Sequence, residues 1–351
     1  MSEERDVLDR IEAFRRARPR FTDDVITLAH GAGGKSSAAL VDAVFLDAFA
    51  NDALAPLTDA ACLDVPAGTI AFSTDSYVVA PRQFPGGSIG HLAVHGTVND
   101  LAMMGARPQW LSAAFVIEEG FAVDELRAIV ADMATAAAAA GVTVVAGDTK
   151  VVNRGAADGL YITTAGVGVV PPGRRVDAAR VHPGDKVIVS GTIGDHGMAV
   201  MLARGDLAIE ADIRSDTAPV AAAVEALFAA APSTRWLRDP TRGGLGTVCN
   251  ELARAAGIAV VLDEPALPVT PAVAAACDLL GIDPLYVANE GKFVAVVAPD
   301  ECEAAVQAVG GDAAVIGTIE ADPAGVVVLV TGFGGTRIVD LLVGDPLPRI
   351  C

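Results

Sequence analysis

The sequence predicts an α/β protein made of two domains and a mobile tail, and three observations support this fold class. The chain has 351 residues, 52% of them hydrophobic, which is enough for two domains with buried cores. Short apolar runs typical of strands alternate with longer segments of helical periodicity. The turn-forming triplet Pro171-Pro172-Gly173 interrupts this alternation near the middle of the chain. We therefore expect one α/β domain on each side of it.

The first domain is expected at residues 23–172, after a charged extension at 1–22. Its predicted strands are apolar runs at about 25–28, 70–75, 110–117, 142–146 and 161–170. Its predicted helices lie between the loop at 30–36 and residue 49, at about 90–104, and at about 124–140, before Gly141. At least four of these strands are expected to form one sheet.

The second domain is expected at residues 173–335, and segment 181–191 opens it. Helical periodicity predicts helices at about 194–205, 217–230, 243–257, 271–280 and 300–309. Apolar runs predict strands at about 258–263, 293–298, 313–319 and 325–330. The remaining residues, 336–351, are predicted to form a flexible tail.

The charge and the cysteines limit the classes of function. A net charge of -19, from 44 acidic and 25 basic residues, disfavours binding to nucleic acid or to an anionic membrane. The five cysteines are scattered and never form a CxxC pair, which argues against a zinc site or a disulfide framework. No secretory signal or membrane-spanning run is visible, so we expect a cytoplasmic protein.

The chain ends on Cys351, in a segment that does not resemble a core element. Pro346 and Pro348 favour extended backbone, and the glycines of segment 332–335 supply a pivot. Fully extended, the residues after this pivot would reach about 50 Å at roughly 3.3 Å per residue. A frayed terminus is the competing interpretation.

A glycine-rich loop between a predicted strand and a predicted helix is suited to bind phosphate. It contains Gly31, Gly33, Gly34 and Lys35, and exposed N–H groups at a helix start attract anions. The loop is not a P-loop, because Ala29 stands where that motif requires glycine. A sharp turn alone would also explain these glycines.

Aspartates recur in predicted turns or at the ends of predicted strands, and together they suggest a site for a divalent cation such as Mg²⁺. These residues are Asp59, Asp75, Asp100, Asp148 and Asp239. Several carboxylates brought together repel one another unless a cation neutralises them. For each of them taken singly, an Asx-turn or a helix N-cap is an alternative.

Lys150 and Glu290 are candidates for proton transfer. Apolar residues flank both, and desolvation there can shift a pKa toward neutrality. An ordinary surface salt bridge is the alternative. His196 lies in a Gly-rich turn and is interpreted as structural, and the other histidines show no metal-ligand spacing.

These segments together resemble the HypE family of hydrogenase maturation factors, within the superfamily of aminoimidazole ribonucleotide synthetase and selenophosphate synthetase. The resemblance runs from about Ile26 to Cys351. The motifs that carry it include residues 29–34, 72–77, 96–100, 147–152, 190–197, 238–244 and 288–292, and the final Pro348-Arg349-Ile350-Cys351. The last of these is specific to this branch of the superfamily.

The resemblance implies an ATP-dependent carbamoyl dehydratase that acts on its own tail. A HypF-type carbamoyltransferase would load Cys351, the dehydration would leave a thiocyanate, and the cyano group would pass to iron held by HypC/HypD. It implies catalysis by Cys351, Lys150 and Glu290, with the roles of the last two exchangeable. It implies cofactor contacts from Gly31, Gly33, Gly34, Lys35, Asn99, Asp148 and Thr149. It also implies a homodimer whose N-terminal sheets close a shared barrel, and a C-terminal α/β sandwich.

Two other functions remain open on the residues. Another ATP-dependent phosphotransferase of the superfamily would use the same aspartates and glycines but would have no use for a terminal cysteine. A non-catalytic thiol carrier or scaffold would present Cys351 without turning over ATP, and it would leave the aspartates unexplained.

Overall fold

The computed structural model describes residues 21–32, 35–55, 57, 61, 63–64, 68–205, 211–342 and 350, and for Lys35 the backbone only. Four predicted site residues therefore lie outside the described residues: Gly33, Gly34, Asp59 and Cys351. Most of the predicted extension at 1–22, and half of the predicted tail at 336–351, also lie outside them.

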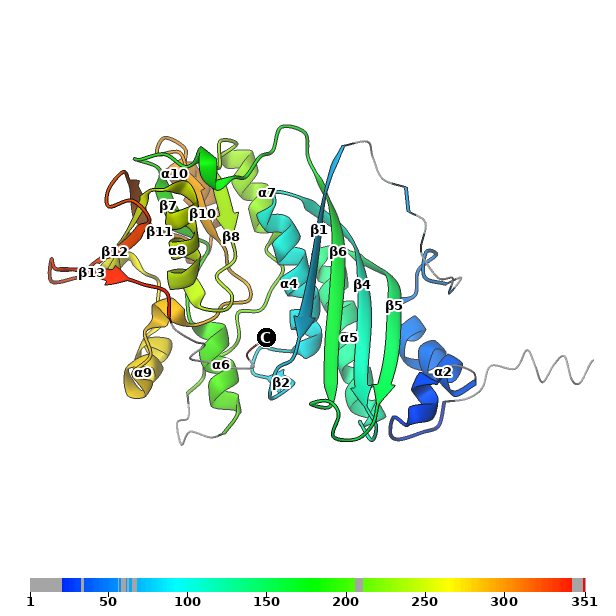
Figure 1. Cartoon of the computed structure of the whole chain (residues 1–351). Coiled ribbons are helices and arrows are strands. Elements are labelled where there is room, and N and C mark those ends of the chain that lie inside the picture. Colours follow the sequence, from blue (N-terminus) through cyan, green and yellow to red (C-terminus); the bar gives the residue numbers. More distant parts are fainter. Residues whose placement is uncertain are drawn as a thin grey trace, which may run out of the picture.

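The N-terminal domain is built on a four-stranded mixed sheet (Figure 1). Its strands, in spatial order, are β1 (Thr69–Tyr77), β6 (Leu160–Val170), β4 (Arg107–Glu118) and β5 (Thr143–Val152). The pair β4 and β5 is parallel and the other two pairs are antiparallel. Strands β1 and β5 are thus the two edges of the sheet.

Helices cover one face of this sheet. These are α4 (Ile89–Met103), α5 (Val123–Ala140) and a helical stretch of α2 (Lys35–Leu40), η2 (Val41–Leu46) and α3 (Asp47–Phe49). Helix α5 ends at Gly141, whose left-handed φ of 68° suits glycine. Nearly all residues of α4 are buried, because this helix packs against the sheet on one side and against the second domain on the other.

The opposite face of the sheet exposes apolar side chains. On β1, Ile70 is 53% exposed and Phe72 is 67% exposed. Residues alternate along each strand, so side chains of β4 and β6 such as Trp110 and Val167 lie on this face and are only half-buried. Within the described residues of one chain, helices are seen against the other face only (Figure 1).

The C-terminal domain has a seven-stranded sheet with helices on both faces. Its strands, in spatial order, are β13 (Thr336–Val339), β12 (Val326–Val330), β9 (Ala259–Asp263), β11 (Ala314–Glu320), β7 (Lys186–Val189), β10 (Val294–Val297) and β8 (Trp236–Arg238). Helix α8 (Gly244–Ala256) shares a core with one face, while α7 (Ala221–Ala230) and α10 (Cys302–Val309) share a core with the other.

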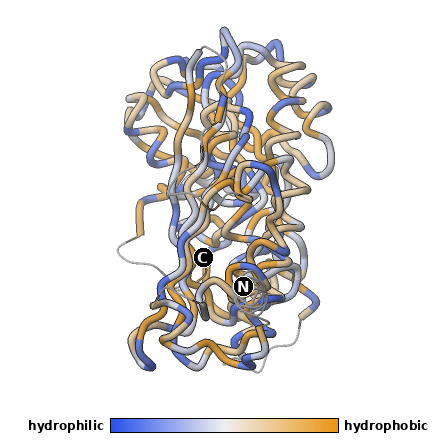
Figure 2. The backbone as a smooth tube through the Cα atoms, turned by 90° about the vertical axis from the view of Figure 1, so that its right-hand side faces the viewer, coloured by the Kyte–Doolittle hydropathy of each residue, from blue (hydrophilic) through white to orange (hydrophobic). Residues whose placement is uncertain are grey.

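Short elements complete the fold. Helices α6 (Asp195–Ala203) and α9 (Pro271–Leu280) pack together beside the first domain, near the β2 (Gln83–Phe84) and β3 (Gly87–Ser88) hairpin. The 3-10 turns are η1 (Leu28–Gly31), η3 (Ala178–Arg180), η4 (Glu264–Ala266) and η5 (Pro284–Tyr286). Hydrophobic residues concentrate along the packed elements, and hydrophilic ones gather in the outer loops (Figure 2). None of the helices in these residues is long and apolar enough to span a membrane.

The fold class is confirmed, with local corrections. The strand predicted at 25–28 is wrong: Val25 makes one isolated bridge, and the chain then turns into η1. The side chain of His30 explains this turn. Its Nδ1 accepts a hydrogen bond from the backbone N–H of Thr27 at 2.9 Å, so this N–H is not available to a neighbouring strand. Strands β8 and β13 were not predicted, and β13 takes up the first residues of the segment predicted as tail.

Candidate functional site

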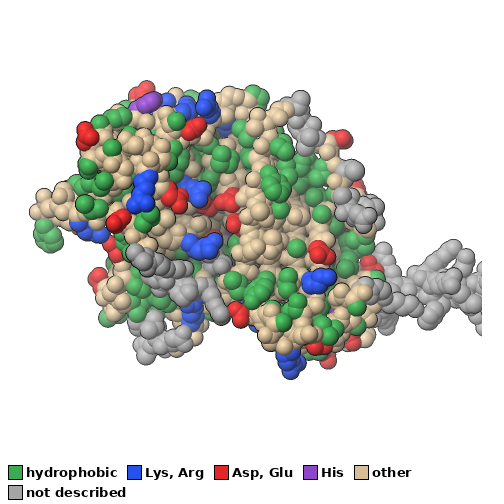
Figure 3. Space-filling model, viewed as in Figure 1, with side chains coloured by type: hydrophobic (Ala, Val, Ile, Leu, Met, Phe, Trp, Pro, Cys, Tyr) green, Lys and Arg blue, Asp and Glu red, His purple; other side chains and the backbone are tan. Residues whose placement is uncertain are grey.

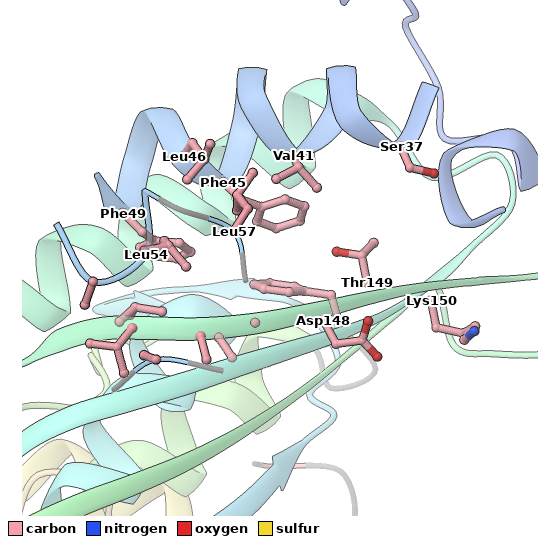
Figure 4. A pocket seen from close by; sticks show the side chains of 18 of the residues that line it. Ser37, Val41, Phe45, Leu46, Phe49, Leu54, Leu57, Asp148, Thr149 and Lys150 are labelled. Carbon is pink, nitrogen blue, oxygen red and sulfur yellow. The ribbon is translucent and has the colours of Figure 1, made fainter. Parts of the chain in front are cut away.

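Two cavities among the described residues are lined by predicted site residues. The first is largely apolar. It measures about 430 Å³ and lies between the helical stretch 35–49 and strands β4 and β5 (Figure 4). Apolar side chains cover most of its wall: Val41, Phe45, Leu46, Phe49, Leu54 and Leu57. The ring of Phe45 packs on that of Phe115, with centroids 4.7 Å apart. We call this the β5 cavity.

Polar groups gather at one end of the β5 cavity. Thr149 points toward the helical stretch, near Ser37 (Figure 4). Its neighbours on β5, Asp148 and Lys150, also line the cavity but alternate to the other face of the strand, where both are exposed. An apolar wall with one polar end matches the two ends of a nucleotide.

Gly31 brings the loop into this polar end. A Cβ at this position would lie 2.7 Å from the backbone nitrogen of Val151, which is closer than such atoms approach. Only glycine therefore permits the loop to approach β5 so closely. The buried His30 holds the turn from the other side, through Thr27 and through Asp23, 3.1 Å from its Nε2.

The second cavity lies between the two domains, measures about 380 Å³ and is acidic. The carboxylates in its wall come from four separate segments: Asp75 on β1, Asp100 on α4, Asp239 after β8, and Glu290 before β10. Acidic and basic side chains gather in the hollow between the domains in Figure 3. We call this the interdomain cavity.

Hydrogen bonds fix two of these carboxylates. The hydroxyl of Ser73 donates to Asp100 at 2.6 Å, and the hydroxyl of Tyr77 donates to Asp75 at 3.2 Å. Gly96 makes room for that phenol, since a Cβ there would lie 2.1 Å from its oxygen. Burial and the nearby Asp75 raise the pKa of Tyr77 well above its usual range, so it remains a donor.

The carboxylates of this cavity repel one another. Burial, followed by the charge of Asp100, raises the pKa of Asp75. Burial and the charges of Asp100 and Asp75 raise the pKa of Asp239 to about 7, although Arg238 opposes the shift. A divalent cation would relieve this repulsion, so the donor set suits Mg²⁺. The described residues of one chain, however, contain no group of three or more His, Cys, Asp or Glu side chains placed to hold a metal ion.

The backbone around Glu290 is held from three sides. Asn289 is fully buried, and its amide donates to the carbonyl of Pro240 at 2.9 Å and accepts from the N–H of Gly194 at 2.7 Å. The amide of Asn99 donates to the carbonyl of Glu290 at 3.1 Å. The carboxylate of Asp216 accepts from the N–H of Glu290 at 3.1 Å. Glu290 is therefore buried at a fixed position.

The structure divides the predicted site residues between the two cavities. Gly31, Asp148, Thr149 and Lys150 line the β5 cavity, and Asp75, Asp100, Asp239 and Glu290 line the interdomain cavity. Asn99 lines neither cavity, because its amide bonds to backbone atoms of residues 218, 220 and 290. For Lys35 only the backbone, at the start of α2, is described.

Within one chain, Lys150 and Glu290 do not share a cavity. Strands β6 and β4 separate the two edges of the sheet, which at about 4.8 Å per strand lie about 14 Å apart. Helices α4 and α5 fill the covered face between them. Of the five aspartates predicted to share a cation site, Asp148 therefore lies apart from Asp75, Asp100 and Asp239 within a single copy of the chain.

Sequence reasoning missed several residues of the interdomain site. Tyr77 and Ser73 lie on β1 on either side of Asp75, and a period of two along that strand would have placed all three on one face. Asp216 is half-buried and stands in no motif, so no local pattern marks it.

Comparisons with known proteins agree over most of the chain. Residues 57–170 match the family described as AIR synthase related protein, N-terminal domain, and residues 182–330 match the corresponding C-terminal domain. The chain is 53% identical to carbamoyl dehydratase HypE of Rhodobacter capsulatus over 337 residues, 94% of this chain and 99% of the relative.

Two solved structures are also similar. One is a hydrogenase maturation protein HypE in complex with ATP, with a TM-score of 0.89 and 45% identity, covering 93% of this chain and 99% of that one. The other is a HypE–HypF complex, with a TM-score of 0.76 and 47% identity, covering 87% of this chain and 100% of that one.

Proposed function

This chain belongs to the carbamoyl dehydratase HypE family of enzymes, within the AIR synthase related proteins, and we propose that it dehydrates a carbamoyl group carried on its own Cys351. The product is a thiocyanate on the same sulfur, which supplies the cyanide ligand of the iron centre of [NiFe]-hydrogenase. ATP is the second substrate.

The chemistry requires activation of a poor leaving group. The carbamoyl oxygen attacks the γ-phosphate of ATP, releasing ADP and forming an O-phosphorylated intermediate, while the nitrogen loses one proton. The C–O bond then breaks, phosphate leaves, the second nitrogen proton is removed, and a C≡N group remains on sulfur. Positioning and charge neutralisation dominate phosphoryl transfer, and the elimination needs a base.

The β5 cavity is the proposed site for ATP. Its apolar wall suits a base and its polar end suits phosphates, and a relative with a TM-score of 0.89 is described in complex with ATP. Gly31, Gly33, Gly34, Lys35, Asp148 and Thr149 are the proposed contacts.

The carboxylates Asp75, Asp100 and Asp239 are the proposed holders of Mg²⁺, together with Asp59 and Asp148. Bound there, the ion would neutralise the charge of the transferring phosphoryl group. Burial, followed by the charge of Asp100, raises the pKa of both Asp75 and Asp239, and a cation bound there would favour their charged forms.

Glu290 is the proposed base for the nitrogen protons, and Lys150 is proposed to orient the carbamoyl oxygen and stabilise charge. Glu290 is only 3% exposed, and its loop is held by Asn289, Asn99 and Asp216. A carboxylate in such surroundings is desolvated and in a fixed place, as a general base requires.

Two copies of the chain are proposed to complete each site. Lys150 lies on β5, at one edge of the N-terminal sheet, and Glu290 of the second domain lines the interdomain cavity together with β1, the other edge. The uncovered face of that sheet exposes Ile70 and Phe72. Closing two such sheets into a shared barrel buries this face and removes the open edges. We infer that β5 of one copy then meets β1 of the other, so that ATP and Lys150 of one chain face Glu290 of its partner.

The proposed partners are the ones that the family resemblance implies. A HypF-type carbamoyltransferase loads the thiol of Cys351, and the HypC/HypD complex carrying iron accepts the cyano group. The solved complex of a relative with HypF supports the first of these interactions.

One observation carries the proposal most directly: Ile350, the residue before Cys351, is buried at 3% exposure in a core cluster that includes Ala288, two residues before Glu290. The test is mass spectrometry of the C-terminal peptide after carbamoylation by the transferase. Loss of one water only when ATP is present is the expected result. A carbamoylated peptide that keeps its mass with ATP would refute the proposal.

A further inference from the structure

The end of the tail occupies a defined seat between the two domains. Ile350 is 3% exposed and belongs to the core cluster that contains Phe84 of β2, Met198 of α6 and Ala288.

His196 forms a hydrogen bond with the backbone carbonyl of Ile350. Its Nε2 lies 3.0 Å from the carbonyl oxygen of Ile350, and its Nδ1 lies 2.8 Å from the hydroxyl oxygen of Ser215. A carbonyl only accepts, so Nε2 carries the proton and Nδ1 accepts from Ser215. The ring is completely buried, and Phe84 meets it edge-on with centroids 5.6 Å apart. Burial lowers the pKa of His196 to about 4, which keeps the ring neutral near pH 7.

The segment 215–217 supports this histidine and is wedged between the two domains. The backbone of Ser215 lies very close to Gly86: a Cβ on Gly86 would be 2.6 Å from the carbonyl oxygen of Ser215. A Cβ on Gly291 would lie 1.9 Å from the carbonyl oxygen of Asp216. The hydroxyl of Thr217 is 3.0 Å from Nδ1 of His95 on α4. Such close packing leaves the segment little freedom to shift.

The same segment holds the loop that carries Glu290. The carboxylate of Asp216 accepts from the N–H of Glu290 at 3.1 Å, while the adjacent Ser215 bonds to His196. Helix α6 also joins this loop directly, because the N–H of Gly197 donates to the carbonyl of Ala288 at 3.0 Å. The seat of the tail and the proposed base are thus built on one hydrogen-bonded frame.

We propose that His196 is a positioning residue that seats the tail by the carbonyl joining Ile350 to Cys351, and that Ser215 and Asp216 hold this seat in register with Glu290. The role given to this seat rests on the proposed function, whereas the contacts between His196, Ser215 and Ile350 do not depend on it. Consecutive Cα atoms are about 3.8 Å apart, so fixing Ile350 confines the thiol to the neighbourhood of His196. Seating then presents the loaded sulfur to the base, and release presents the free thiol to the carbamoyltransferase.

The test measures how well the seat protects the thiol, in the full-length chain without ATP. Iodoacetamide labelling of Cys351 is followed over time by mass spectrometry of the C-terminal peptide, and a synthetic peptide of residues 340–351 gives the rate for an unseated thiol. The variants are His196→Phe, which removes the donor, and His196→Gln, which keeps an N–H near the position of Nε2. Ile350→Ala empties the apolar part of the seat from the tail side, where loss of folding is not expected.

The wild-type thiol should react more slowly than the peptide. His196→Phe should speed labelling by about fivefold, the effect of losing one net hydrogen bond, and His196→Gln should restore most of the protection. Ile350→Ala should speed it by about tenfold or more. The double variant should not exceed the peptide rate, because both changes release one seat. Melting temperatures within about 2 °C of wild type separate release of the tail from general loosening.

Equal labelling of wild type and peptide would overturn the proposal. If Cys351 is labelled at the same rate in Ile350→Ala as in wild type, the proposal is also overturned, whether or not the His196 variants fold. Failure of the proposed function is a different result: the carbamoylated wild type would lose no water with ATP while the labelling differences persisted.

Discussion

The β5 cavity and the interdomain cavity differ in chemistry and in the way they are built. The β5 cavity is largely apolar, opens at one edge of a sheet and is made mostly from consecutive residues of β5 and one helical stretch. The interdomain cavity is acidic, lies at the other edge and draws its carboxylates from four distant segments. The first is suited to hold a nucleotide and the second to hold charge and move protons. Neither cavity alone contains the proposed set of reacting groups.

The first prediction addresses the interdomain cavity and has the largest expected effect. Glu290→Gln should lower the rate of water loss from carbamoylated Cys351 by about a thousandfold, because the amide cannot take a proton. Binding of ATP, measured by calorimetry, should stay at the wild-type value, since Glu290 does not line the β5 cavity. The control is Glu303→Gln on the exposed surface of α10. Equal loss of ATP binding and dehydration would show that the two cavities are not functionally separate.

The second prediction concerns the face that joins the two cavities between copies. Phe72→Glu places a charge on the exposed apolar face of β1 and should convert the dimer to monomer, seen by light scattering. Dehydration should fall by about a hundredfold, because the reacting groups are no longer held together. Phe333→Glu, at a fully exposed residue after β12, is the matched control. A monomeric variant with full activity would place the whole site within one chain.

The third prediction concerns the β5 cavity alone. Gly31→Ala should weaken ATP binding by about tenfold, because the new Cβ would collide with Val151 and push the loop away from the strand. Loading of Cys351 by the carbamoyltransferase should not change. Gly332→Ala is the control, since a Cβ there would lie at an ordinary 3.6 Å from its neighbour. Unchanged ATP affinity in Gly31→Ala would remove this loop from the nucleotide site.

The fourth prediction uses the raised pKa of Asp239, about 7. At pH values between the usual pKa of an aspartate and 7, the carboxyl of Asp239 holds a proton in the folded chain and has lost it in the unfolded chain. The stability that this group contributes therefore falls as the pH rises through that window. Asp239→Asn removes the penalty and should melt about 3 °C higher than wild type at pH 8, with a smaller difference at pH 5. Added Mg²⁺ should raise the melting temperature of wild type more than that of the variant. If the melting temperatures of Asp239→Asn and wild type differ by the same amount at every pH, the electrostatic account is contradicted.

The sequence predicted local elements well where local chemistry decides them. Helix α5 ends at Gly141 as expected, because a left-handed residue there stops the helix. Strand β8 was missed, since its three residues acquire their conformation from pairing with β10. The stretch at 25–28 looks apolar enough for a strand, but His30 turns it.

The candidate site was predicted residue by residue and not as an arrangement. Glycines and aspartates carry recognisable motifs, and eight residues predicted from the sequence line the two cavities; the apolar residues that form most of the β5 cavity wall carry no such motif. The order of the strands is set by long-range pairing, which no local pattern contains, so the separation of Asp148 from Asp75 could not be seen. His196 was interpreted as structural because its partner, Ile350, lies 154 residues away.

The most direct measurement of the central claim mixes two inactive variants. Glu290→Gln and Lys150→Met are each inactive as homodimers in this account, for lack of one reacting group at every site. Exchanged in equal amounts, half of the dimers are mixed, and one site of each mixed dimer holds both residues, so about a quarter of wild-type dehydration should return. Activity no greater than that of the separate variants, with subunit exchange verified by native mass spectrometry, would contradict a site shared between two chains.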